Sequence, residues 1–402
     1  MSADITKEAY TQAIGVLRHA VRPNGFFASG LPGGYEATWA RDSMIASLGA
    51  SLAGAEFRDP FRNSLAVLAK HQSPHGQIPN CVGDYNEERK SDITFNSMDS
   101  SLWYIMGHHI YADAFQDTEF LSTHKKSIEA ALEWISFQDP NEDGLPVQQP
   151  TTDWQDAFPH KYGRVLLTQT LYYAALRMQK KDAEANRLQR VVNREQEQYL
   201  SLFDKKLGYY LPWIWKTHDA YREEARWFDA FGNLFAVVSG LATPSITKSI
   251  LDYVEKEEIN RPYPVKAIWP PIEKGSADWQ AYFEACEART PYQYLNAGIW
   301  PFLGGWYVAA LVKAGQIQKA ETELQHLAEA NRLIKKEDDI ADWGFYEWID
   351  GKTGIVTGGA NPYQSWSAGM YIFAYECVKQ NRVPYFSPNP QPVLQNSDAP
   401  FS

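Results

Sequence analysis

The sequence has few cysteines and no long apolar run, and these absences exclude several classes of protein. Its three cysteines, Cys81, Cys286 and Cys377, are odd in number, far apart and outside any CxxC motif. Neither a disulfide framework nor a thiolate zinc site is therefore predicted. No apolar stretch reaches the ~18 residues that a membrane span requires. The first residues are polar and partly acidic rather than an apolar signal core, so we expect a cytoplasmic protein with no membrane partner.

The chain also lacks a net positive charge and the common catalytic motifs. Its formal net charge is −11, whereas a protein that binds nucleic acid needs a basic face to neutralise phosphates. The HExxH, Walker and GxSxG motifs are all absent, so the reactions that they support are not indicated. His108 and His109 are adjacent, point in different directions on a helix, and are interpreted as structural. We expect no nucleic-acid partner, no metal ion and no cofactor.

Strand-like alternation of apolar and polar residues is almost absent, while helical periodicity recurs along the chain. Residues 384–402 are rich in proline, asparagine and serine, and we expect them to form an extended surface tail. The sequence thus predicts one all-α domain over residues 1–383, followed by this tail. The twelve predicted helices cover about residues 6–20, 43–54, 60–71, 97–115, 119–136, 164–180, 183–202, 226–241, 244–256, 293–314, 317–332 and 364–379.

The connections between these helices alternate in length. Short links follow every even-numbered helix, and long loops follow every odd-numbered one. Short links join antiparallel neighbours in helical bundles, so all six long loops should lie at one end. Six helix hairpins closed into a ring, an (α/α)6 barrel, would produce this arrangement, with the more apolar even-numbered helices inside. Long loops in a compact domain are usually functional, so we expect the functional site at that end.

Aromatic residues are unusually frequent, at 14% of the chain with 14 tryptophans, and many lie in the long loops beside carboxylates. A sugar ring offers apolar C–H faces and hydroxyl edges, which aromatic rings and polar side chains match. The alternative is that the aromatic residues simply fill a large core. That alternative explains the aromatic residues in helices better than those in loops. We therefore expect a small saccharide as substrate.

Two carboxylates in these loops, about 190 residues apart, are candidates for catalysis. Asp156 lies in the third long loop, and Glu347 lies in the sixth. Each alone is equally consistent with a carboxylate that caps a helix or meets solvent. Together, on opposite sides of the predicted ring, they suit the acid and the base of a glycoside hydrolase. Burial beside Trp154 and the charge of Asp153 would raise the pKa of Asp156, while Glu347 must stay ionised.

Other loop residues are candidates for holding the sugar. Asp42 is placed to cap the second predicted helix, but with its neighbour Arg41 it could also bind two sugar hydroxyls. Asp99 lies near the start of a predicted inner helix, at the same end of the ring. Trp227 and Asn296 come from the fourth and fifth long loops.

Five short motifs, from four of the long loops, carry a family resemblance. Thr-Trp-Ala-Arg-Asp-Ser at 38–43 and His-Gly-Gln-Ile-Pro-Asn at 75–80 look most like the glucosidase domain of glycogen debranching enzymes. Residues 226–233 and 296–301 look like neutral/alkaline invertases (glycoside hydrolase family 100), and Met-Asp-Ser-Ser-Leu-Trp at 98–103 is similar to both. The chain thus resembles the (α/α)6 glycoside hydrolases that include these two groups.

The resemblance spans roughly residues 39–375 and implies Asp156 as general acid and Glu347 as general base. Trp154, beside the acid, and Gln169, which matches a family glutamine, complete the candidate set. The resemblance also implies a glucose-holding subsite shaped by Trp39, Arg41, Asp42, Asp99, Trp103, Gln364 and Trp366.

The chain departs from the family patterns at three places. Leu167 stands where a glutamate is usual, Tyr346 stands where invertases have a proline, and residues 359–362 lack a basic residue of the invertase pattern. These departures keep the carboxylate pair but leave the aglycone open.

The combined prediction is an inverting glycoside hydrolase that releases glucose from an α-glucoside, either a sucrose-like disaccharide or an α-1,6-linked glucosyl unit. The alternative substrate is a small glucoside such as glucosylglycerate. A sugar 2-epimerase on the same barrel would need paired catalytic histidines, for which His71, His75 and His160 are the loop candidates. A non-catalytic sugar-binding protein would not need both carboxylates in one pocket. A homo-oligomer is compatible with the sequence.

Overall fold

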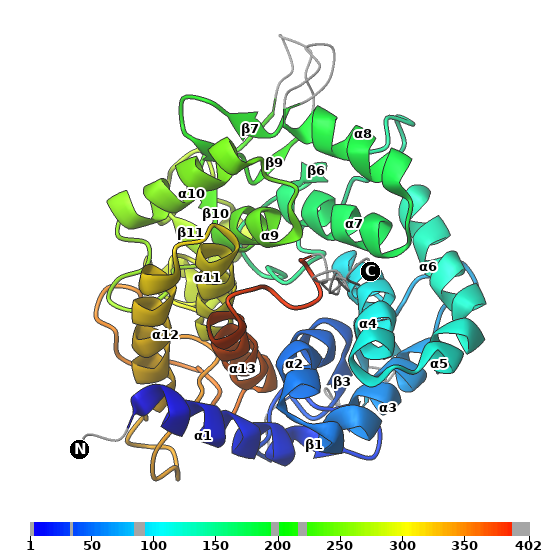
Figure 1. Cartoon of the computed structure of the whole chain (residues 1–402). Helices are drawn as coiled ribbons and strands as arrows, with labels where there is room; N and C mark the ends of the chain where they lie inside the picture. The colour runs from blue at the N-terminus through cyan, green and yellow to red at the C-terminus, as the bar shows by residue number, and fades with distance from the viewer. Residues whose placement is uncertain (1–3, 33–34, 84–92, 194–200, 216–222, 388–402) are drawn as a thin grey trace, which may run out of the picture.

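The computed structural model describes residues 4–32, 35–83, 93–193, 201–215 and 223–387, and within these it is an (α/α)6 barrel (Figure 1). Consecutive inner helices contact one another, and the last contacts the first, so the ring is closed. The outer helices are α1 (Ile5–Ala20), α3 (Arg58–Lys70), α5 (Thr118–Thr123), α6 (Lys125–Ser136), α8 (Asp182–Val192), α10 (Pro244–Lys256) and α12 (Ile317–Arg332). The inner helices are α2 (Ala40–Ala53), α4 (Asp99–Phe115), α7 (Leu166–Met178), α9 (Ala230–Ser239), α11 (Pro301–Lys313) and α13 (Ser365–Gln380).

The inner helices differ from the outer ones in how their side chains are buried. In α11 every residue from Pro301 to Val312 is buried, whereas α8 buries only four residues, on one face. A helix that is apolar on all sides needs neighbours on all sides, while an amphipathic helix needs only one. This difference explains which helices form the inner ring, as the sequence predicted.

In the described part of the chain, eleven two-residue strands, paired in antiparallel fashion, hold the long loops together. Three of them, β3, β6 and β10, run directly into the inner helices α2, α7 and α9. The strands are β1 (Val21–Arg22), β2 (Gly25–Phe26), β3 (Thr38–Trp39), β4 (Cys81–Val82), β5 (Ile93–Thr94), β6 (Arg164–Val165), β7 (Phe203–Asp204), β8 (Tyr209–Tyr210), β9 (Trp213–Ile214), β10 (Phe228–Asp229) and β11 (Ile268–Trp269).

The long loops all precede inner helices, as predicted, but several helix bounds differ. The helix expected from residue 43 begins at Ala40, the one expected over 119–136 is divided at His124, and the one expected from 226 begins after β10. The helix expected from 293 begins only at Pro301, because Ile299 is held in backbone bridges to Lys266 and Ile349. The predicted helix 183–202 is α8 up to Val192, and residues 194–200 lie outside the described part.

The end of the barrel opposite the long loops is closed by the C-terminal segment. Phe386 packs against Phe235 and Trp306, with ring centroids 5.4 and 6.0 Å away, and its carbonyl accepts a 2.6 Å hydrogen bond from Lys313 Nζ. Residues 384–387 are therefore packed against the barrel, unlike the surface tail predicted there. The aromatic rings of this segment gain more by burial than by exposure. The rest of the predicted tail, 388–402, lies outside the described residues.

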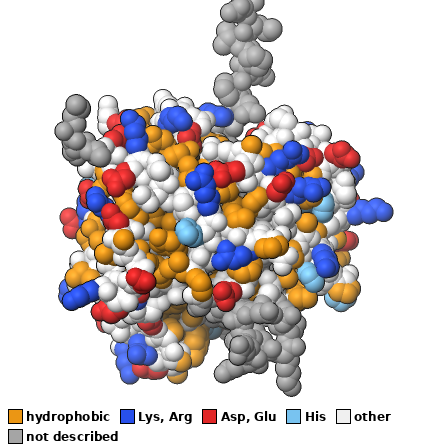
Figure 2. All heavy atoms as spheres, turned by 90° about the horizontal axis from the view of Figure 1, so that it is seen from below, with side chains coloured by type: hydrophobic (Ala, Val, Ile, Leu, Met, Phe, Trp, Pro, Cys, Tyr) orange, Lys and Arg blue, Asp and Glu red, His pale blue; other side chains and the backbone are white. Residues whose placement is uncertain are grey.

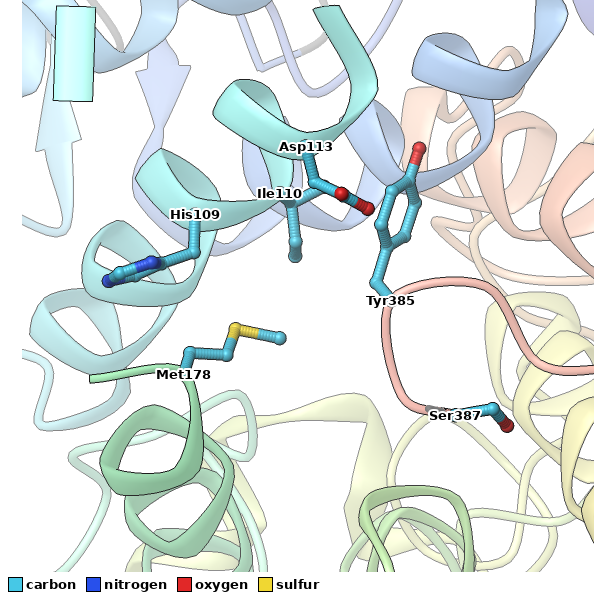
Figure 3. Close-up of a pocket in the computed structure, with 6 residues that line it drawn as sticks. All are labelled: His109, Ile110, Asp113, Met178, Tyr385 and Ser387. Carbon is cyan, nitrogen blue, oxygen red and sulfur yellow. The ribbon is translucent and has the colours of Figure 1, made fainter. Parts of the chain in front are cut away.

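A cavity of about 260 Å³ lies beside this segment, between the ends of α4 and α7 (Figure 3). The side chains of Ile110 and Met178 point into it, and the ring of Tyr385 forms one wall. It is therefore at the far end of the barrel from the long loops. Its lining residues are His109, Ile110, Asp113, Met178, Tyr385 and Ser387.

The surface on the side of α1 carries acidic, basic and hydrophobic side chains interspersed (Figure 2). This face has no broad area of a single charge, while the absence of a nucleic-acid partner stays a prediction. Within the described residues, no helix combines the length and apolarity that a membrane span needs.

Ring closure depends on a close contact between α2 and α13, which gives the first prediction. A Cβ added at Gly49 would lie 1.8 Å from the carbonyl oxygen of Gly369, so Gly49→Ala should force the two helices apart. Overpacking of this kind costs about 1–3 kcal/mol of unfolding free energy, measurable by urea denaturation. Gly15→Ala is the matched control, because Gly15 has nothing within 4 Å and lies in the interior of α1. There alanine should stabilise by up to ~1 kcal/mol. Equal effects of the two substitutions would contradict the close packing.

Candidate active site

A cavity of about 150 Å³ opens among the long loops, at the ends where the inner helices begin. Its residues come from the loops before α2, α7, α11 and α13 and from the first turns of α2 and α13. The structure therefore brings four distant loops together around one cavity. The lining residues are Tyr35, Trp39, Arg41, Asp42, Trp154, Asp156, Tyr294, Trp300, Glu347 and Trp366.

Both candidate catalytic carboxylates line this cavity, in different surroundings. Glu347 is buried and is held by two donors: Tyr35 Oη lies 3.1 Å from its Oε1, and Asn361 Nδ2 lies 3.5 Å from its Oε2. The backbone reinforces this contact, because Glu347 N donates to the Asn361 carbonyl at 2.8 Å. Asp156 has an exposed side chain, since it faces the open cavity.

The pKa of Asp156 is raised, mainly because the protein atoms around the cavity desolvate its carboxyl. The charge of Asp153 raises it further, while the charge of Arg41 opposes the shift. This direction and its two causes were predicted from the sequence, and both are confirmed. A carboxyl with a raised pKa keeps its proton to higher pH, as a general acid requires.

Burial raises the pKa of Glu347 to about 8, and the charge of Asp42 adds to the shift. The hydrogen bonds from Tyr35 and Asn361 act in the opposite direction, because they stabilise the ionised form. The expectation that Glu347 stays ionised therefore holds only above about pH 8 in the free protein. The Glu347 carboxyl therefore ionises under mildly alkaline conditions.

Arg41 is the one cation among the lining residues, and it is already paired. Its Nε donates to Asp99 Oδ2 at 2.8 Å, and both side chains are buried. Asp99 therefore acts on the cavity through Arg41 rather than by lining it. Asp42 lies inside the first turn of α2 and does not cap the helix, since Trp39 is the N-cap residue. Burial raises the pKa of Asp42 to about 6.

Six of the thirteen predicted site residues do not line the cavity. Besides Asp99, these include Trp103, which packs against Phe231 and Trp306, and Trp227, which is buried in the core. Gln169 donates to the Pro146 carbonyl at 2.7 Å, so it fixes the loop that carries Asp156. The other two are Asn296 and Gln364.

Asn296 and Gln364 have different surroundings. Asn296 bonds the backbone of Ile272 and Ala288, so it shapes the loop before α11. Gln364 is fully buried at the N-cap position of α13, and its amide has no hydrogen-bond partner within the described residues. The predicted substrate contacts of these six residues stay predictions.

Three lining residues, Tyr35, Tyr294 and Trp300, are absent from the predicted set. Burial and the charges of Glu347 and Asp156 raise the pKa of Tyr294 well above its usual value. The Tyr294 hydroxyl therefore interacts electrostatically with both the Glu347 and the Asp156 carboxyl. The signal that could have identified these residues is an aromatic residue in a long loop, but too many residues in this chain share it.

The histidines that an epimerase would use lie elsewhere. His71, His75 and His160 are not among the residues that line the cavity. The ring of His160 lies 2.9 Å from Tyr282 Oη, in a contact between the loops before α7 and α11. Within the described residues, no group of three or more His, Cys, Asp or Glu side chains has the geometry of a metal site.

Comparison with known families matches residues 202–381 to the model of the alkaline and neutral invertases. This stretch contains Glu347 but begins after Asp156. The probable alkaline/neutral invertase D of Arabidopsis thaliana is 38% identical over 156 residues, which is 38% of this chain and 27% of that protein. Cytosolic invertase 1 of Oryza sativa subsp. japonica is 36% identical over 156 residues, 38% of this chain and 26% of that protein. The chain thus matches about a quarter of the length of these relatives.

Among solved structures, the GH63 mannosylglycerate hydrolase of Thermus thermophilus, in complex with glucose, superposes with a TM-score of 0.66. The superposition covers 90% of this chain and 99% of that one at 15% identity. The (α/α)6 fold class predicted from the sequence is confirmed. The predicted resemblance to (α/α)6 glycoside hydrolases is confirmed as well.

Proposed function

We propose that the protein is a glycoside hydrolase that releases one glucose unit from an α-glucoside with inversion at the anomeric carbon. The observation that supports this most is that Asp156 and Glu347, from loops about 190 residues apart, line the same small cavity. A scaffold or a simple sugar-binding protein has no need of two desolvated carboxyls in one pocket. Perturbed carboxyls in a cavity are typical of catalytic sites.

In the proposed reaction Asp156 is the general acid and Glu347 is the general base. Asp156 gives its proton to the glycosidic oxygen as the C1–O bond breaks, and the aglycone leaves as an alcohol. Glu347 takes a proton from a water molecule that attacks C1 from the opposite face. The loops before α7 and α13 are three places apart in a ring of six, which favours the wide spacing of carboxyls that inversion needs.

The size and lining of the cavity favour a single sugar ring. Its volume of about 150 Å³ is below the ~300–1,000 Å³ of pockets for drug-sized ligands. Trp39, Trp154, Trp300 and Trp366 supply apolar surface around it, and carboxylates and Arg41 supply hydrogen-bonding groups. Glucose as that ring draws on the invertase-like stretch of the chain and on the glucose complex of the Thermus hydrolase.

The charges of the cavity favour a neutral aglycone. Asp42, Asp156 and Glu347 are acidic, and the one lining cation, Arg41, is already paired with Asp99. The carboxylate of an aglycone such as glycerate would lie beside three acidic groups, with no unpaired cation among the described lining residues. We therefore favour a sucrose-like disaccharide or an α-1,6-linked glucosyl unit over glucosylglycerate.

The location and assembly of the protein are also proposals. A cytoplasmic location draws on the small number of cysteines in the sequence and on the cytosolic relative from rice. A homo-oligomer stays a prediction, as does the single catalytic domain over residues 1–383.

The function is tested with a substrate screen followed by Asp156→Asn. Sucrose and isomaltose should be hydrolysed with a higher kcat/KM than glucosylglycerate, measured as free glucose. On the best substrate Asp156→Asn should lower kcat by about 10²–10⁴-fold. The same variant should retain most activity on α-glucosyl fluoride, because fluoride leaves without a proton. Near-normal activity of Asp156→Asn on the natural glycoside, with the fold intact by circular dichroism, would refute the acid assignment.

The raised pKa of Glu347 predicts an alkaline activity profile. The base must be ionised, so kcat/KM should rise with pH through a midpoint of about 8 and be low at pH 6. Tyr35→Phe removes a hydrogen bond that favours the ionised form, so the midpoint should move to higher pH. Tyr104→Phe is the matched control, because its hydroxyl contacts Ser127 at 2.8 Å and not the cavity. If the pH midpoint of kcat/KM were unchanged in Tyr35→Phe, the rise of activity with pH would not come from the ionisation of Glu347.

A further inference from the structure

The loop that carries Asp156 is fastened at its base and has a buried lysine inside. Gln148 and Gly163 exchange two backbone hydrogen bonds of 2.9 Å, so the chain between them forms a closed loop. Asp156 lies near the middle of this loop. Lys161, near its end, is fully buried, which is rare for a lysine and requires a partner.

Lys161, near the end of this loop, contacts residues that come before Asp156 in the same loop. Its Nζ lies 2.9 Å from Asp153 Oδ2 and 2.6 Å from Gln155 Oε1, and all three side chains are essentially inaccessible to solvent. Asp153 also accepts a hydrogen bond from the Gln155 backbone at 2.9 Å and from Gln148 Nε2 at 3.0 Å. The residue directly before Asp156 and the residue three before it are thus both held by one ammonium group.

The two catalytic candidates differ in how they are held. The Glu347 carboxyl accepts hydrogen bonds directly from the side chains of Tyr35 and Asn361. No side chain of another described residue hydrogen-bonds the Asp156 carboxyl, although Asp153 and Gln155 before it both contact Lys161. The position of the acid must therefore come from the loop backbone, which the lysine fixes.

We propose that Lys161 is a positioning residue, which holds Asp156 where it can deliver its proton to the glycosidic oxygen. This inference rests on the proposed role of Asp156 as the general acid. The buried Lys161–Asp153 ion pair is expected to add little to the stability of the fold, because the cost of desolvating two charges often cancels their attraction. Its value lies in the fixed geometry of the loop, since a misplacement of about 1 Å can cost on the order of 100-fold in rate.

Asp156 is surrounded by several charged groups that set its proton affinity. Arg41 lowers its pKa, while Asp153 and Asp99 raise it, and Asp42 and Tyr294 also interact with it electrostatically. Asp229 is buried near Lys161 and Asp153, and burial raises the pKa of its carboxyl to about 6. The influence of Lys161 on the acid therefore passes through the loop and through Asp153.

The test compares Lys161→Met with Asp156→Asn on two substrates. Lys161→Met should lower kcat on the natural glycoside by on the order of 100-fold, while kcat on α-glucosyl fluoride changes by a few-fold at most. Asp156→Asn, run in parallel, checks the acid role itself. Glu323→Gln is the matched control. Glu323 is a buried carboxylate on α12, outside the cavity, and its Oε1 lies 3.0 Å from Arg261 Nη1. The substitution should destabilise the fold without changing the ratio of the two rates.

The outcomes separate the two claims. Equal losses on both substrates in Lys161→Met, with a selective loss in Asp156→Asn, would overturn the positioning role and keep the proposed function. Equal losses in Asp156→Asn would overturn the acid assignment itself.

A second variant keeps the test decisive if Lys161→Met does not fold. Lys161→Met/Asp153→Asn removes both charges of the ion pair, and the nearby Asp229, with its raised pKa, can take up a proton. This variant should therefore fold and still lose glycoside activity selectively. Because the Asp153 charge raises the pKa of Asp156, the basic limb of its pH profile should also move to lower pH. Wild-type rates on both substrates and an unmoved basic limb in this variant would contradict the proposal.

Discussion

The structure depends on the contact that closes the ring, between α2 and α13. Gly49 meets the backbone of Gly369, and Gly369 in turn meets Ala46, so the two helices approach with almost no side chain between them. This contact joins the first hairpin to the last, and so brings Arg41 and Glu347, far apart in sequence, to one cavity. Without closure of the ring, the six long loops would not converge, and Asp156 and Glu347 would not line one cavity.

Closure also creates the electrostatic conditions of the site. The loops converge around one cavity, and burial is the first cause of the raised pKa of Asp42 and Glu347. The Asp156 side chain faces the open cavity, and desolvation by the surrounding protein atoms is the first cause of its raised pKa. Arg41 opposes the shift at Asp156 but is itself shared with Asp99. The site therefore favours protonated carboxyls near neutral pH. A raised pKa suits Asp156 as the proposed acid, while Glu347 as the proposed base requires mildly alkaline conditions.

The sequence was sufficient to predict the barrel because its signals are local. Alternating loop lengths and helical periodicity fixed the order of inner and outer helices, and carboxylates in the third and sixth loops led to the pair that shares the cavity. Contacts across the barrel have no local signal. Tyr35 reaches Glu347 over 312 positions of sequence, and nothing near either residue indicates that bond.

Other differences between expectation and structure have similar physical causes. The family resemblance implies that Trp103 shapes the subsite, yet its ring packs against Phe231 and Trp306 in the core. The apolar periodicity from Tyr294 onward predicted an earlier helix start. The helix begins only at Pro301, because Ile299 forms long-range backbone bridges. The network around Lys161 was not foreseen, because a lysine in a polar loop usually faces solvent.

The most direct test of the acid and base pair is the stereochemistry of the first product. Proton NMR of an α-glucoside digest, recorded in the opening minutes before mutarotation, distinguishes the two anomers of glucose. If Asp156 protonates the leaving oxygen while Glu347 activates water on the opposite face, β-glucose appears first. Release of α-glucose first would contradict this account, because Glu347 would then act as a nucleophile in a retaining reaction.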